Sequence, residues 1–213
     1  MKTEDLVAML STEAAPVDRK LLARTVFIAL GGGVVLAVCF VVAGLGVRAD
    51  LMAARALLFL FLKLVFALGI VCVASIYLMK LARPGGERRI SSALVILPFI
   101  AIVLIAAINL GFAPKSHWDK MIMGDDWLEC LLSIPIIAIA PFAFIIWALR
   151  RAAPTNLARA GAVAGLVSGG VSAMAYALHC SDDSLPFIAV WYGSTIVLCT
   201  FAGAIFGSRL LRW

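Results

Sequence analysis

Six long apolar runs constrain this chain more than any other feature of its 213 residues. A bilayer hydrocarbon core about 30 Å thick needs roughly 20 apolar residues of α-helix to cross it. Runs of that length fall at 25–47, 56–81, within 90–114, at 127–149, 160–178 and within 184–208. The sequence therefore predicts an all-α fold, a polytopic membrane helical bundle with about six transmembrane helices.

The connections between these runs are short. The longest, 115–129, has only 15 residues, which is too few for a second folded domain. The first apolar run is 23 residues long and lacks the small-residue cleavage pattern of a secretory signal peptide, so we expect it to be retained. The predicted organisation is a cytoplasmic N-terminal tail, residues 1–24, and a six-helix transmembrane domain, residues 25–213.

Basic residues predict the orientation of the bundle. Only Arg48, Arg55, Lys115 and Lys120 flank the runs on one side. Thirteen lysines and arginines flank them on the other: Lys2, Arg19, Lys20, Arg24, Lys80, Arg83, Arg88, Arg89, Arg150, Arg151, Arg159, Arg209 and Arg212. The positive-inside rule then places both termini in the cytoplasm. Because topology accounts for the net charge of +6, no direct nucleic-acid binding is expected.

The tail, MKTEDLVAMLSTEAAPVDRKLLAR, contains one short amphipathic pattern. Leu6, Met9 and Leu10 would share one face of a helix that Pro16 ends. So short a helix needs a surface to pack on, and its acidic residues favour a protein groove over anionic lipid. The three apolar residues are therefore a candidate partner-binding face, with an ordinary frayed tail as the alternative.

Glycines recur in the fifth run at four-residue spacing, at Gly161, Gly165 and Gly169. A stripe of glycine on one helix face lets another backbone approach closely. Every helix of a bundle needs neighbours, so we expect this face to pack inside the bundle and not against a second copy.

Lys63 is the one charge well inside an apolar run. Intramembrane charges are candidate functional sites. Lys63 lies only about two turns from the outer end of its run, so we expect it to snorkel to the membrane interface.

Two cysteines reach the outer, non-cytoplasmic interface. Cys130 lies at the start of the fourth span and Cys180 just beyond the end of the fifth. A helix N-terminus favours the thiolate of Cys130, whereas a helix C-terminus disfavours that of Cys180, so Cys130 is the predicted attacking thiol and Cys180 the resolving one. Three further cysteines lie within apolar runs and are expected to be packing residues: Cys39, Cys72 and Cys199.

Three interpretations of the outer cysteine pair remain open from the residues alone. The two thiols can form a disulfide in an oxidising compartment, or bind a soft metal together with His179, or simply pack at helix ends. No CxxC motif or paired-histidine spacing chooses among them. Phosphate-binding glycine loops, HExxH motifs and nucleophile elbows are absent from the sequence, so neither an enzyme nor a resident cofactor is expected.

Three segments carry a family resemblance: MKTEDLVAMLSTEAAPV at the start, DDWLECL around Trp127 and Cys130, and ALHCSDDSLPFIAVWYG at 177–193. With six spans, the chain resembles the NrsF family of bacterial membrane proteins, negative regulators of the extracytoplasmic-function sigma factor sigma F. The resemblance implies a multi-pass anti-sigma factor of the inner membrane. It would sequester this sigma factor and release it when periplasm-facing Cys130 and Cys180 respond to oxidative or heavy-metal stress.

Other residues of these segments would form a loop that supports that sensor. The implied supporting residues are Trp127, His179, Asp182, Asp183, Pro186, Trp191 and Tyr192. The implied partners are the extracytoplasmic-function sigma factor and the lipid bilayer.

The alternative function is a small-solute or ion transporter of the inner membrane, with Lys63, Asn109 and the outer carboxylates along its path. It predicts solute flux and indifference to deletion of residues 1–16. A membrane thiol enzyme is a weaker alternative, which predicts turnover at the outer cysteines.

Overall fold

The computed structural model describes residues 19–82, 93–152 and 154–212. Within these ranges the six segments long and apolar enough to cross a membrane are Ala23–Leu45, Ala54–Leu81, Ala93–Phe112, Lys115–Leu149, Leu157–Tyr176 and Leu185–Leu210. The described chain forms helices and no strands. The predicted all-α fold with six membrane-spanning helices is confirmed.

Each span is built from one main helix with short helical additions. The first is α2 (Arg19–Phe40) with the π-helical turn η1 (Val41–Leu45), followed by α3 (Ala54–Leu81) and α4 (Ala93–Phe112). The 3₁₀ turn η3 (Lys115–His117) and the short α5 (Trp118–Met123) lead into α6 (Trp127–Leu149) and α7 (Leu157–Tyr176). The last span comprises α8 (Leu185–Phe187), the π-helical turn η4 (Ile188–Tyr192) and α9 (Gly193–Leu210).

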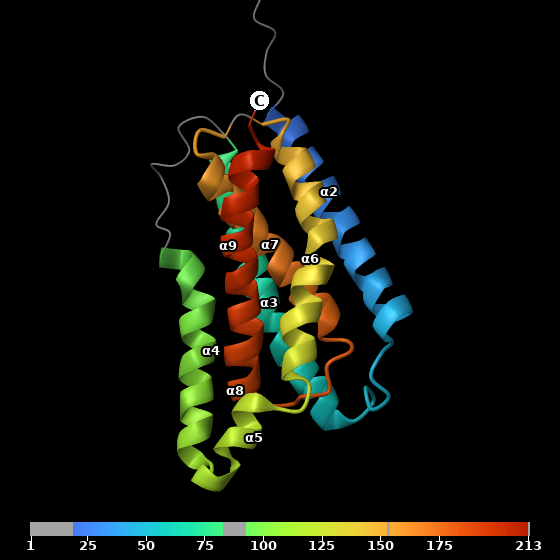
Figure 1. Ribbon diagram of the computed structural model, residues 1–213, viewed down its shortest axis with the longest axis vertical. Helices are drawn as coiled ribbons and strands as arrows, with labels where there is room; N and C mark the ends of the chain where they lie inside the picture. Colours follow the sequence, from blue (N-terminus) through green and yellow to red (C-terminus); the bar gives the residue numbers. More distant parts are fainter. Residues whose placement is uncertain (1–18, 83–92, 153, 213) are drawn as a thin grey trace, which may run out of the picture.

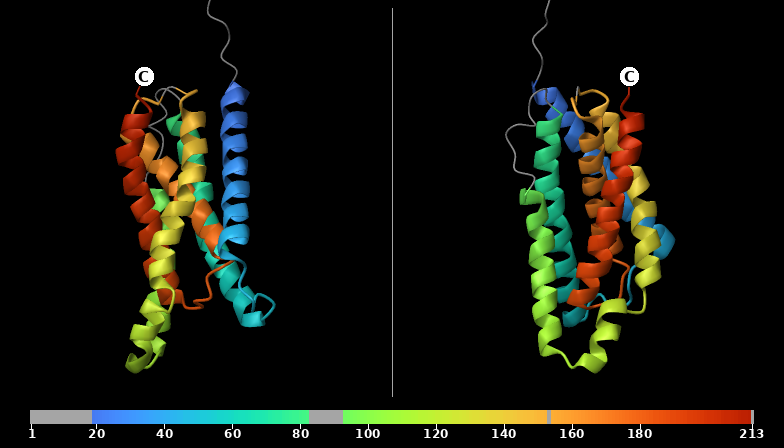
Figure 2. Two further views of the ribbon diagram at one scale, coloured as in Figure 1. Left: turned by 45° about the vertical axis from the view of Figure 1, so that its right-hand side comes forward. Right: turned by 60° about the vertical axis from the view of Figure 1, so that its left-hand side comes forward.

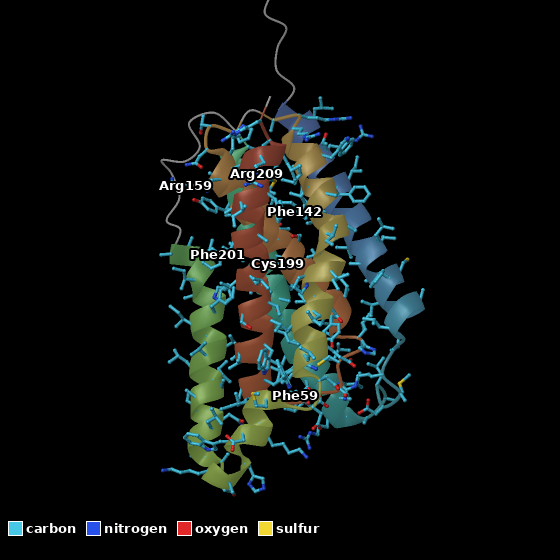
Figure 3. All side chains as sticks on the ribbon, viewed as in Figure 1. Phe59, Phe142, Arg159, Cys199, Phe201 and Arg209 are labelled. Carbon is cyan, nitrogen blue, oxygen red and sulfur yellow. The ribbon has the colours of Figure 1, made fainter. Side chains whose placement is uncertain are left out.

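The helices form an upright bundle around α7 (Figures 1 and 2). Helix α7 packs against α2, α3, α6 and α9, whereas α4 stands at the edge beside α3 and α8. The start of α2 and the C-terminus lie at one end, here called the termini end, and α5 marks the opposite α5 end (Figure 1). Arg159 and Arg209 lie toward the termini end and Phe59 toward the α5 end (Figure 3).

Both ends of the transmembrane domain therefore share one side of the bundle, as six crossings require. Which side faces the cytoplasm stays a prediction from the positive-inside rule. The proposed tail face of Leu6, Met9 and Leu10 lies outside the described residues.

The outer surface of the bundle is apolar, as expected of a face that meets lipid. Helix α4 buries only Ile102 and Ala106 among its described residues, and leaves leucines and isoleucines such as Leu97 and Ile108 exposed. Helix α7 differs from α4 in its burial, because nearly all residues of α7 are buried and many of them are small. Residue size thus decides which helix occupies the centre.

Glycines join α7 to α9 at backbone contact. A Cβ atom added to Gly161 would lie 2.7 Å from the Cα of Gly207, and one added to Gly203 would lie 2.8 Å from the Cα of Gly165. Gly169 faces α9 in the same way, against Cys199. The prediction that the α7 glycine face packs inside the bundle is confirmed, and the matching glycines of α9 are its partner surface.

Candidate functional site

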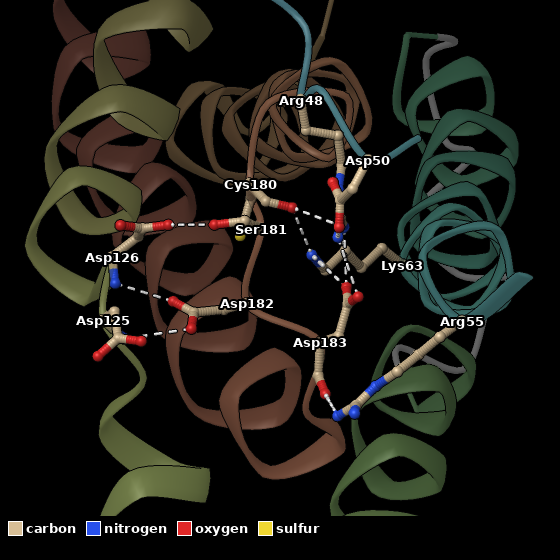
Figure 4. Close-up of polar contacts among 10 residues, drawn as sticks. All are labelled: Arg48, Asp50, Arg55, Lys63, Asp125, Asp126, Cys180, Ser181, Asp182 and Asp183. Carbon is tan, nitrogen blue, oxygen red and sulfur yellow. Dashed lines mark hydrogen bonds and ion pairs between the residues drawn. The ribbon is translucent and has the colours of Figure 1, made fainter. Parts of the chain in front are cut away.

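A network of four charges closes the α5 end of the bundle, with Arg48 and Lys63 buried, Asp183 largely covered and Asp50 exposed at its outer edge (Figure 4). The Arg48 guanidinium donates to both carboxylate oxygens of Asp50 at 2.7 and 2.8 Å and to both of Asp183 at 2.8 and 3.0 Å. The Lys63 ammonium lies 3.8 Å from the Asp183 carboxylate. Lys63 Nζ also donates to the Cys180 carbonyl oxygen at 3.0 Å, and Arg48 donates to that same oxygen at 3.2 Å. Two cations and two anions therefore balance around one backbone carbonyl.

The prediction that Lys63 snorkels to the interface is wrong. Its side chain is 0% exposed, and its ammonium points inward to Cys180 and Asp183. A buried ammonium requires a counter-ion and hydrogen-bond acceptors, and the loop after α7 supplies both. The Tyr192 ring adds a third contact, with its centroid 5.8 Å from Lys63 Nζ.

Hydrogen bonds within the network shift the pKa values of Arg48 and Asp50 toward their charged forms. The bonds that Arg48 donates to Asp50 and Asp183 raise the pKa of Arg48 above its ordinary value, and the bonds to Asp50 lower the pKa of that carboxyl. A carboxylate with a lowered folded-state pKa stabilises the fold above its unfolded pKa, and that contribution disappears as pH falls through the lowered value. The Arg48–Asp50 pair is therefore intact at neutral pH.

Asp182 ties the loop after α7 to the start of α6. Its carboxylate accepts hydrogen bonds from the backbone N–H groups of Asp125 and Asp126, at 3.1 and 2.9 Å. In the same place the Ser181 hydroxyl donates a hydrogen bond of 2.8 Å to the Asp126 carboxylate. An anion at a helix N-terminus satisfies free N–H groups and complements the helix dipole. Residues 125–130 and 180–183 thus form one unit.

Gly124 is required at this junction, because its φ is +60° and a Cβ atom there would lie 2.6 Å from both the Asp182 carboxylate and the Phe187 ring. We expect Gly124→Ala to lower the free energy of unfolding by about 2 kcal/mol, since alanine disfavours that backbone conformation and displaces the Asp182 cap. Gly111→Ala is the control, because its Cβ would meet nothing within 4 Å. Equal unfolding free energies for the two variants in detergent titrations would contradict this prediction.

Aromatic and hydroxyl contacts fix α5 over the same unit. Trp191 Nε1 donates to the Ile122 carbonyl at 2.9 Å, and the Trp191 ring lies 5.0 Å from that of Trp127 between centroids. The Ser184 hydroxyl donates to the Met121 carbonyl at 2.6 Å. Pro186 occupies the first turn of α8, where its missing N–H costs no hydrogen bond.

The two outer cysteines lie beneath this cover. Cys130 is 0% and Cys180 is 1% exposed, and both belong to one buried cluster. Both thiols are free, and the Ser181–Asp126 hydrogen bond joins the two segments that carry them. Tyr176 and Tyr192 lie in the same cluster, with their ring centroids 6.3 Å apart. The structure therefore brings together two thiols that are 50 positions apart in the sequence.

His179 faces away from a shared site with the thiols. Its Nδ1 atom is 3.0 Å from the Gly46 carbonyl oxygen, and its Nε2 atom is 3.8 Å from a Glu129 carboxylate oxygen. In the part of the chain that the structure describes, no three His, Cys, Asp or Glu side chains are grouped to hold a metal ion. The predicted ligand set of Cys130, Cys180 and His179 remains a prediction.

All the implied sensor residues lie at the α5 end, and the contacts show what most of them do locally. Sequence reasoning missed three residues of the site. Arg48 served only as a basic residue in the topology prediction, and nothing in the pattern marked Asp50 or Tyr176. The sequence did mark Lys63 as a candidate, since an isolated charge inside a membrane span requires a partner. Its partners lie more than 110 residues away, so the sequence pattern did not identify them.

Comparison with known proteins gives one consistent result. The family model described as "Negative regulator of sigma F" matches residues 10–213. The chain is 33% identical over 213 residues to a protein of Azospira oryzae named "Probable anti-sigma-F factor NrsF", and 30% identical over 215 residues to the "Anti-sigma-F factor NrsF" of Caulobacter vibrioides. Each alignment covers 100% of both chains. No solved structure matches the chain.

Proposed function

Because this chain belongs to the NrsF family of negative regulators of sigma F, we propose that it is an anti-sigma factor of the bacterial inner membrane. It sequesters an extracytoplasmic-function sigma factor. The observation that carries this proposal is full-length similarity to two proteins named as anti-sigma-F factors. The family is regulatory, and no catalytic role is proposed.

The proposed sigma-binding surface lies on the cytoplasmic side. It comprises the tail, residues 1–24, with its apolar face of Leu6, Met9 and Leu10, together with the arginine-rich connections. An acidic amphipathic helix suits a basic protein groove, and membrane-fixed arginines suit acidic patches on a soluble partner.

The proposed sensor is the pair Cys130 and Cys180, which responds to an oxidant or a soft heavy metal. Support comes from their shared buried cluster and from the contacts that join the start of α6 to the loop after α7. A covalent change at either thiol alters packing in a core that tolerates little change in volume. The backbone at Cys180 must then move relative to Arg48 and Lys63.

Lys63 offers a route from the sensor to the cytoplasmic side. It lies on α3, which runs from the α5 end to the termini end (Figure 1). Moving a complex from 99% bound to 99% free needs about 5.5 kcal/mol of differential stabilisation. One disulfide supplies about 2–4 kcal/mol, so we expect oxidation alone to release only part of the sigma factor.

Co-purification tests the proposal. The tagged protein is solubilised in mild detergent, with and without residues 1–16, and cytoplasmic proteins bound to it are identified by mass spectrometry before and after hydroperoxide or cadmium treatment. We expect a sigma factor that needs the tail for binding and is partly shed on treatment. In the Cys130→Ser, Cys180→Ser double variant, shedding should be lost.

The matched control is the Cys39→Ser, Cys72→Ser double variant. These cysteines lie in spans and face outward, away from the buried cluster. The control should shed the sigma factor like the wild type. Absence of any bound sigma factor in untreated cells would refute the anti-sigma role and make solute flux, the transporter's signature, the next measurement. Normal shedding by the Cys130→Ser, Cys180→Ser variant would refute thiol control alone.

A further inference from the structure

Two buried phenol hydroxyls at the α5 end have no acceptor. Tyr176 and Tyr192 are each 0% exposed, and neither hydroxyl has a hydrogen-bond partner among the described residues. A buried hydroxyl without a partner is costly, and most proteins avoid it. Two such groups on neighbouring rings indicate a place prepared for an acceptor that the reduced protein lacks.

The two outer cysteines share a buried cluster with these two tyrosines. Contacts of the Cys180 backbone bring this residue close to both rings. Its N–H donates to the Tyr176 carbonyl at 3.0 Å, and its carbonyl oxygen accepts from Lys63, whose ammonium lies 5.8 Å from the centroid of the Tyr192 ring. A thiol sulfur is a weak acceptor. An oxygen bonded to that sulfur is a stronger acceptor and extends farther from the Cys180 backbone.

A local distortion of the helix places Tyr192 in this position. Residues Ile188–Tyr192 form a π-helical turn, η4, at the start of the last span. Such turns are rare and are frequently found at functional sites. The Lys63 ammonium over the Tyr192 ring adds positive potential on the same side as the Cys180 carbonyl.

We propose that Tyr192, with Tyr176, is a positioning residue for the oxidised sensor: its hydroxyl donates a hydrogen bond to the oxygen of a sulfenic acid formed on Cys180. This inference rests on the proposed thiol control and specifies its intermediate. Cys180 is thus the thiol oxidised first, the reverse of the order that the helix dipole favours. Tyr176 supplies the second donor of the pair.

The chemistry balances with a hydroperoxide as oxidant. The Cys180 sulfur attacks the terminal oxygen of the hydroperoxide, the O–O bond breaks, and a sulfenic acid and an alcohol or water form. Sulfur loses two electrons and the peroxide gains them. The Cys130 thiol then attacks the Cys180 sulfur, an S–S bond forms, and the sulfenic oxygen leaves as water with the thiol proton.

A pocket at the α5 end lies against the backbone on both sides of Cys180. An outer pocket with a volume of about 400 Å³ is lined by polar residues that include both sequence neighbours of Cys180, His179 and Ser181. Arg48 and Asp50 form another wall of that pocket. A small hydroperoxide held there reaches the buried thiol through a local opening of residues 179–181.

The test measures the lifetime of the sulfenic acid. The full-length Cys130→Ser protein, which has no resolving thiol, is treated with hydrogen peroxide in detergent. Sulfenic acid on Cys180 is then trapped with dimedone at increasing delays and located by mass spectrometry. Adding Tyr192→Phe should shorten the lifetime about fivefold, the effect of one net hydrogen bond, and Tyr176→Phe should also shorten it. Tyr77→Phe, which alters a partly buried tyrosine on α3, should leave it unchanged.

A second measurement separates positioning from folding. In the reduced state Tyr192→Phe removes a hydroxyl without a partner, so its melting temperature should equal or exceed that of its parent. An unchanged sulfenic-acid lifetime in Tyr192→Phe would overturn the inference. So would the absence of any sulfenic acid on Cys180, even if the cysteine pair still controlled sigma release. A protein that binds no sigma factor would refute the proposed function, yet the lifetime measurement would still decide the role of Tyr192.

Discussion

Gly165→Leu is expected to prevent most of the protein from folding, with a loss of about 3 kcal/mol or more in the free energy of unfolding. Helices α7 and α9 meet there at backbone contact, and a Cβ atom on Gly165 would overlap the Cys199 carbonyl and lie 3.1 Å from the Cα of Gly203. Backbone atoms cannot rotate away as a side chain can. Relief therefore requires the two most closely packed helices of the bundle to separate.

The measurement is the yield of monodisperse protein in detergent, followed by titration with a denaturing detergent. Gly31→Leu is the matched control, because a Cβ atom on Gly31 in α2 would meet nothing within 4 Å. It adds the same apolar volume to a membrane helix. A Gly165→Leu protein with the yield and unfolding midpoint of the Gly31→Leu control would show that α7 and α9 do not pack as described.

Lys63→Met is expected to cost about 3 kcal/mol, the lower end for removing one partner of a buried ion pair. Methionine keeps most of the side-chain volume but removes the ammonium, so Asp50 and Asp183 are left with Arg48 as their only cation in the network. The Cys180 carbonyl loses its 3.0 Å donor and retains Arg48. The loss should appear as a lower unfolding midpoint at neutral pH.

A double-mutant cycle separates charge balance from packing. Adding Asp183→Asn to Lys63→Met leaves one cation, Arg48, facing one anion, Asp50, and should recover part of the stability. Lys120→Met, on the exposed face of α5, is the control and should change little. Additive losses from the Lys63 and Asp183 substitutions would rule out their coupling.

Lys63 also links stability to the proposed signal. Its ammonium bonds to the backbone of one sensor cysteine, and its helix crosses the whole bundle. If oxidation at Cys180 is transmitted through α3, a folded Lys63→Met protein should bind its sigma factor and shed less of it after oxidation. Co-purification with the Cys130→Ser, Cys180→Ser variant as reference measures this difference.

The sequence by itself determined the class of fold and the location of the site along the membrane normal. Hydropathy over about 20 residues is a local property that the bilayer thickness converts directly into helices. The lengths of the apolar runs also placed Cys130 and Cys180 at helix ends on one side of the membrane. Separately, the four-residue glycine spacing indicated that α7 would be closely packed. The segments around Trp127 and at 177–193 carried the family resemblance that the comparisons then established.

Only the tertiary structure decided which groups meet at that depth. Helix rotation and neighbour order turned Lys63 inward to a carbonyl 117 residues away, where depth alone favoured the interface. The same packing gave Asp182 and Asp183 separate roles as helix cap and counter-ion, and enclosed two tyrosine hydroxyls beside two thiols. Hydropathy fixes how deep a residue lies, but not the direction in which its side chain points. The neighbours in that direction determine which ion pairs and hydrogen bonds a buried charge or hydroxyl can form.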